Sequence, residues 1–183
     1  MMFVSLGLGT LLAVIAIVVV SVLTGGSPSS TSSTTAPPAL VGARVAPFTL
    51  PGLEGGTITP PWRHHHPAIL IFFASWCGPC QGEMPAVARY LRDHRVAPVR
   101  VIGVDANDQR AAARQFVARD HVTFPVGFDA NGVVTSQVFH FVTLPETVFV
   151  NARGVVTGVH FGAIPVSELA RGVRALVAAG RQS

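Results

Sequence analysis

The strongest constraint on the fold is an uninterrupted apolar run, Ala68 to Ala74 (AILIFFA), that is followed within six residues by the two cysteines of the chain, Cys77 and Cys80. A run of this length without a polar residue is typical of a strand that is buried on both faces of a sheet. Pro79, between the cysteines, is tolerated in the first turn of a helix, so we expect a helix to begin there. This order places the cysteine pair at the carboxyl end of a central strand, where open α/β sheets carry their sites.

The rest of this domain alternates between strand-like and helix-like segments. Short extended pieces around a Gly-Gly turn predict an N-terminal β-hairpin. We expect this hairpin at residues 48–50 and 57–59, further strands at 99–104, 147–150 and 155–161, helices over about 107–119 and from Pro165 onward, and a loop or short helix before residue 147. The alternation implies a parallel sheet with crossover connections, to which the last hairpin adds antiparallel strands. The predicted fold class is therefore α/β, a central mixed sheet flanked by helices.

The N-terminal part of the chain differs from this domain. Residues 3–23 carry no charge and no proline, and about 20 apolar residues suffice to span the hydrocarbon core of a bilayer. A cleaved signal peptide is the main alternative, although its apolar region is usually only ~7–15 residues long. Residues 25–39 (GGSPSSTSSTTAPPA) have the composition of a flexible linker. We therefore expect a transmembrane anchor at 1–24, a linker at 25–40 and a single globular domain at 41–183.

Composition argues against two classes of protein. All 13 basic residues are arginine, against 9 acidic residues, and they are scattered along the domain without interleaved aromatic residues. This pattern does not indicate a nucleic-acid-binding surface. Two cysteines are also too few for a fold that is built on disulfides.

The C-x-x-C spacing at a helix start favours thiol–disulfide exchange. Unpaired backbone N–H groups and the helix dipole stabilise a thiolate at this end. Cys77 could attack an external disulfide, and Cys80, one turn inside, could resolve the mixed disulfide. Gly78 and Pro79 keep the connection tight, and Trp76 would offer a flat apolar surface to a partner.

A metal site and a structural staple are the alternatives for the cysteines. A structural zinc ion needs four ligands and this motif supplies two. His64, His65 and His66 lie before the apolar run, and so at its other end. A staple that closes so short a loop would stabilise the fold little. We expect no metal and no cofactor.

Two further residues have both a structural and a functional interpretation. Glu83 lies three positions after Cys80, one turn along the same helix face, where a carboxylate could take the proton that Cys80 loses. Acidic residues are, however, common in the first turns of helices. Pro145 precedes a predicted strand and is either an ordinary turn residue or the site of a cis peptide bond.

The motif W-C-G-P-C in this strand–helix setting resembles the thioredoxin superfamily. Residues 42–56 (GARVAPFTLPGLEGG) and the continuation after Cys80 (QGEMP) resemble the membrane-anchored TlpA/ResA-like thiol–disulfide oxidoreductases of bacteria, over roughly residues 41 to 180. The resemblance implies a thioredoxin fold, a location outside the cytoplasm and a dithiol that reduces protein disulfides, often those of apocytochrome c. It also implies that Glu83 is functional and that Pro145 is cis, faces the cysteines and helps to hold the partner.

We therefore expect a single-pass, membrane-tethered, monomeric enzyme that reduces disulfides of exported proteins and receives electrons from a membrane donor. The expected catalytic residues are Cys77, Cys80 and Glu83, and the expected substrate-binding residues are Trp76, Gly78, Pro79, Leu144 and Pro145. The main alternative is an oxidant that inserts disulfides. A peroxidase would require a threonine where Ala74 stands, and a copper-delivery module would have to use His121, His140 or His160.

Overall fold

The strand that contains the apolar run is the centre of a five-stranded sheet. The computed structural model describes residues 40–94, 96–140 and 143–181. In it β3 (Ala68–Phe73) is buried at all six positions. The sheet has the order β5-β4-β3-β6-β7, with β4 (Arg100–Ala106), β5 (Val126–Asp129), β6 (Glu146–Val150) and β7 (Val156–Phe161). β4 pairs parallel with β3, and β5 pairs parallel with β4. β6 pairs antiparallel with both β3 and β7, so the predicted mixed sheet is confirmed.

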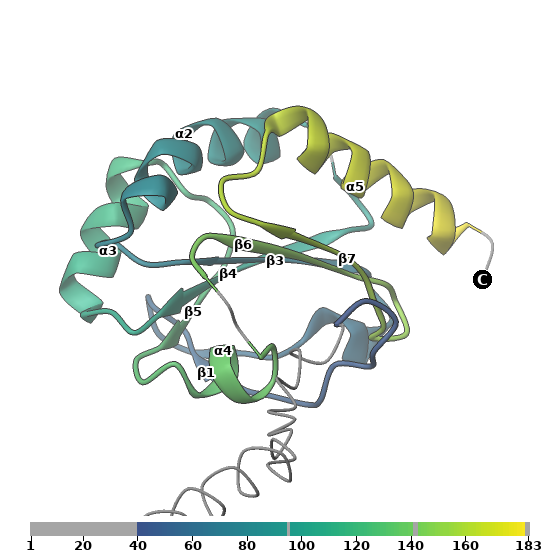
Figure 1. The fold of residues 1–183 in the computed structure, drawn as a ribbon, viewed down its shortest axis with the longest axis horizontal. Helices are drawn as coiled ribbons and strands as arrows, with labels where there is room; N and C mark the ends of the chain where they lie inside the picture. Colours follow the sequence, from purple (N-terminus) through teal and green to yellow (C-terminus); the bar gives the residue numbers. More distant parts are fainter. Residues whose placement is uncertain (1–39, 95, 141–142, 182–183) are drawn as a thin grey trace, which may run out of the picture. The chain divides into compact units, whose positions relative to one another are not determined.

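Helices cover both faces of this sheet (Figure 1). Helices α2 (Gly78–Asp93), α3 (Arg110–Arg119) and α5 (Val166–Gly180) lie on one face, and the short α4 (Val133–Gln137) lies on the other. Side chains alternate along β3, so Ile69, Ile71 and Phe73 pack under the three long helices. Leu70 and Phe72 belong to the opposite core layer. The arrangement is the thioredoxin-like α/β fold that the sequence predicted.

A second, two-stranded sheet lies in the segment where a hairpin was predicted. β1 (Leu50–Pro51) pairs antiparallel with β2 (Thr57–Ile58). After the hairpin's first strand, the Leu53 N–H donates to the Val126 carbonyl at 2.8 Å, and Arg110 donates to the Leu53 carbonyl at 2.8 Å. These bonds join the hairpin to β5 and α3. A 3₁₀ helix, η1 (Pro61–His64), connects it to β3.

One prediction was incomplete, because β5 was not expected as a strand. Its four residues include Gly127, which lacks a side chain that could show strand periodicity. The glycine makes room for the hairpin, since a Cβ atom at position 127 would lie 2.8 Å from Leu50 Cδ1 and 3.1 Å from Leu50 Cβ. The close contact with the hairpin therefore favours glycine in β5, and this glycine interrupts the alternation of side chains by which the strand could have been predicted.

The predicted anchor (1–24) and nearly all of the predicted linker (25–40) lie outside the described residues. Within residues 40–94, 96–140 and 143–181, no helix has the length and apolar character needed to span a bilayer.

Candidate active site

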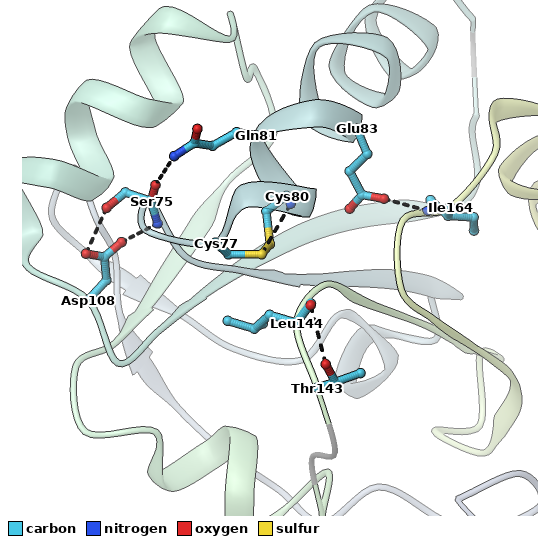
Figure 2. Close-up of a disulfide and its surroundings, with 9 residues drawn as sticks. All are labelled: Ser75, Cys77, Cys80, Gln81, Glu83, Asp108, Thr143, Leu144 and Ile164. Carbon is cyan, nitrogen blue, oxygen red and sulfur yellow. Dashed lines mark hydrogen bonds between the residues drawn. A yellow bond between two sulfur atoms is a disulfide. The ribbon is translucent and has the colours of Figure 1, made fainter.

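Cys77 and Cys80 form a disulfide at the amino end of α2 (Figure 2). Cys77 is the N-cap residue of the helix, with extended backbone angles, and its Sγ atom accepts a hydrogen bond from the Cys80 N–H at 3.2 Å. Pro79 has no N–H, so the Cys80 N–H is one of few free donors in this turn. In the reduced protein this donor and the helix dipole favour a thiolate on Cys77.

The two sulfur-bearing residues differ in accessibility. Cys77 is 5% exposed, whereas Cys80 is fully buried at 0%. Both residues are buried, and only Cys77 keeps a small exposed area through which an external disulfide could approach. This difference favours Cys77 as the attacking thiol and Cys80 as the resolving thiol, and the two roles remain a prediction.

The residues before Cys77 are held by the loop between β4 and α3 (Figure 2). Asp108 accepts from the Ser75 N–H at 2.5 Å and from the Ser75 hydroxyl at 3.0 Å. Trp76 Nε1 donates to the Asn107 carbonyl at 2.9 Å, and Gln81 Nε2 donates to the Ser75 carbonyl at 2.7 Å. We name this set of bonds the Ser75–Asp108 clamp. It fixes the backbone that presents Cys77 to solvent.

Apolar side chains lie around the disulfide at the surface. Trp76 is 61% exposed although its ring nitrogen is bonded. Leu144 lies opposite the disulfide in Figure 2, and the Leu144–Pro145 peptide bond is cis, as the family resemblance implied. The Pro145 carbonyl accepts from the Gly162 N–H at 2.9 Å, which ties this loop to the end of β7. Trp76, directly before Cys77 in the chain, and Leu144, across from the disulfide, are thus the apolar side chains beside it.

Glu83 is buried one turn after Cys80, with 7% of its surface exposed. Its Oε2 atom accepts from the Ile164 N–H at 2.5 Å, and its Oε1 atom has no hydrogen-bond partner among the described residues. Burial raises the pKa of Glu83 from 4.5 to about 7, while the Ile164 hydrogen bond and the charge of His160 act in the opposite direction. A carboxyl group with this pKa can both accept and return a proton near neutrality.

A second buried acid, Asp105, was missed by the sequence analysis. It lies at the carboxyl end of β4 beside Phe73 of β3 and is 0% exposed. Neither of its carboxyl oxygens accepts a hydrogen bond from an N–H or hydroxyl donor in the described part of the chain. Burial, and secondarily the neighbouring Asp108, raises its pKa from 3.8 to about 8. An acidic residue that directly follows an apolar strand was the signal that could have identified it.

The histidines do not join the cysteines. His64 ends η1, which precedes β3, whereas the cysteines follow the opposite end of this strand. His121 and His140 occupy left-handed backbone positions in loops, and His160 lies on β7. Among the residues that the structure describes, no three His, Cys, Asp or Glu side chains are grouped so that they could hold a metal ion.

The fold and the cysteine site agree with comparisons to known proteins. A model of the AhpC/TSA family matches residues 41–159. The chain belongs to the AhpC/TSA family. It is 29% identical over 124 residues to the thiol-disulfide oxidoreductase ResA of Halalkalibacterium halodurans, a match that covers 68% of this chain and 70% of that protein.

Comparison with solved structures also finds disulfide oxidoreductases. The chain is 32% identical to MTB dsbF, solved in mixed oxidized and reduced forms, with a TM-score of 0.62, and the match covers 70% of this chain and 94% of dsbF. It is 26% identical to a secreted Mycobacterium tuberculosis disulfide oxidoreductase homologous to E. coli DsbE. That match has a TM-score of 0.63 and covers 70% of this chain and 96% of the other. The relatives of this AhpC/TSA-family chain are thus thiol–disulfide oxidoreductases.

Proposed function

We propose that this thiol–disulfide oxidoreductase works outside the cytoplasm and reduces disulfides of exported proteins through Cys77 and Cys80. The observation that carries the proposal is the geometry of the pair, in which Cys77 caps α2 and keeps 5% exposure while Cys80 has none. This is the arrangement that an attacking and a resolving thiol require.

The reaction has two exchange steps. The Cys77 thiolate attacks one sulfur of the substrate disulfide, so that a mixed disulfide forms and one substrate thiolate leaves. Cys80 then loses its proton to the Glu83 carboxylate and attacks Cys77 Sγ, which releases the second substrate thiolate. The substrate gains two electrons and the enzyme is left with the Cys77–Cys80 disulfide seen in the structure.

The apolar surface around Cys77 suits an unfolded or extended partner segment. Trp76 and Leu144 would contact the substrate chain near the disulfide, together with the exposed Gly78 and Pro79. Pro145 is buried and would act by holding the loop that carries Leu144. Apocytochrome c is the substrate that the family resemblance implies. Burial of apolar area on these side chains would stabilise the complex by roughly 25 cal/mol per Å².

The location outside the cytoplasm is supported by the uncharged apolar segment at residues 3–23. It is also supported by the similarity to a secreted disulfide oxidoreductase. An enzyme that reduces substrates there must regain two electrons per cycle, and a membrane donor would supply them.

The reduction potential of the Cys77–Cys80 pair tests the direction of electron flow. The full chain in detergent would be equilibrated with dithiol/disulfide buffers, and its redox state read by alkylation. We expect a value near that of thioredoxin, about −270 mV. A value near about −120 mV, as in strong oxidants, would reverse the proposal to disulfide insertion.

A further inference from the structure

A chain of polar contacts runs from the surface of α5 to the buried Glu83. His160, on β7, has its Nδ1 atom 3.2 Å from Oε2 of Glu168 in the first turn of α5. Its Nε2 atom is 3.2 Å from the Ala163 carbonyl oxygen. Both neighbours are hydrogen-bond acceptors, so an imidazole ring with a hydrogen on each nitrogen donates in both contacts. The ring is therefore held from two sides.

The second contact leads directly to Glu83. The Ala163 carbonyl and the Ile164 N–H belong to the same peptide unit, and this N–H donates to Glu83 Oε2 at 2.5 Å. The C=O and N–H of a planar peptide are rigidly coupled, and hydrogen bonds at both ends polarise each other. A bond from His160 to the oxygen thus orients and strengthens the bond from the nitrogen to the carboxylate.

The charge of His160 acts in the same direction as the Ile164 hydrogen bond. A positive charge on His160 favours the ionised form of Glu83. From α5, Glu168 faces His160, and Arg171 faces Glu168 at 3.8 Å. From the loop before α5, the neutral Ile164 N–H donates to the Glu83 carboxylate.

We propose that His160, held by Glu168, is a positioning residue that orients the Ala163–Ile164 peptide and with it the Glu83 carboxylate for proton exchange with Cys80. The proposal rests on the proposed function, because it assigns His160 to the resolving step. It leaves the first exchange step, by Cys77, independent of His160. A loss of His160 should therefore change one step and its pH dependence, and not the other.

An aromatic disulfide reagent that releases a coloured thiolate separates the two steps. Reduced protein releases a first thiolate when Cys77 attacks and a second when Cys80 resolves. The rate of each release would be measured against pH for the full chain, for His160→Leu, which loses both contacts, and for His160→Gln, which keeps one donor. His64→Gln is the matched control, since His64 is at the other end of β3.

We expect the midpoint of the second release to rise by roughly 0.5–1 pH unit in His160→Leu, because a favourable charge is lost. The first release should stay within about twofold. His160→Gln also lacks the charge, so its midpoint should rise too, but its remaining donor should keep its second release faster than that of His160→Leu. An unchanged midpoint in a folded His160→Leu or His160→Gln protein would overturn the proposal. Absence of any second release in the unsubstituted protein would instead overturn the proposed function.

Discussion

Two carboxyl groups with raised pKa values lie under the redox site, and they differ in their surroundings. Glu83 keeps one hydrogen bond, from Ile164, and its pKa rises to about 7. Asp105 has Asp108 as a charged neighbour, and its pKa rises to about 8. When protonated, Asp105 can share its proton with Asp108, which also holds Ser75. Only Glu83 lies on the helix of the cysteines, so Asp105 affects the site through the Ser75–Asp108 clamp.

Asp105→Asn should change how stability depends on pH. Asp105 has an ordinary pKa of 3.8 and a folded pKa of about 8, so between these values the folded state holds a proton that the unfolded state has released. The free energy of unfolding therefore falls as pH rises through this window, by up to about 1.4 kcal/mol per pH unit. Asparagine resembles the protonated acid and cannot ionise, so the variant should lose this slope.

Urea unfolding at a series of pH values would measure the effect. We expect the two proteins to be similar near the acid end of the window and the variant to be more stable at its alkaline end. Equal slopes for both proteins would contradict the raised pKa of Asp105. Glu54→Gln is a suitable control, because Glu54 has a side chain that is 71% exposed.

At the scale of elements, the connection between β3 and α2 is fixed by the connection between β4 and α3. Asp108→Asn replaces one of the two oxygens that hold Ser75. Loss of one charged hydrogen bond should lower the free energy of unfolding by about 1.5–3 kcal/mol. The measurement belongs near pH 6, where Asp105 holds its proton in the folded state. Asp93→Asn is the control, since Asp93 is exposed and forms a surface ion pair with the exposed Arg92. Equal unfolding free energies for both variants would contradict the clamp.

The packing of α5 on β6 depends on Gly172. A Cβ atom there would lie 2.1 Å from Phe149 Cε1, so the ring would have to move. Gly172→Ala gains about 1 kcal/mol in helix propensity but forces this overlap, which costs about 1–3 kcal/mol or more in a packed core. We expect a net loss of stability in thermal unfolding. Gly180→Ala, in the same helix with open space around it, should be neutral or stabilising, and a stabilising Gly172→Ala would contradict the close packing.

At the scale of the whole molecule, the features that could be predicted are those whose residues are close together in the sequence. The apolar run of β3 and the cysteines are adjacent in the chain, so the site at the carboxyl end of the sheet could be expected. The Ser75–Asp108 clamp could not, because its partners are 33 residues apart and each is an ordinary polar loop residue. The contact of His160 with the Ala163–Ile164 peptide depends on how β7 turns into α5, which residue types alone do not specify.

The proposed reaction requires that Cys77, and not Cys80, forms the bond to the substrate. The most direct test is to incubate reduced Cys80→Ser and Cys77→Ser proteins with a disulfide-bonded peptide and to map any adduct by mass spectrometry. We predict a lasting mixed disulfide on Cys77 in Cys80→Ser, because no resolving thiol remains, and little adduct in Cys77→Ser, because Cys80 is fully buried. The proposed reaction would be contradicted if Cys80 in the Cys77→Ser protein formed an adduct as fast as Cys77 does in the Cys80→Ser protein. It would also be contradicted if neither protein formed an adduct.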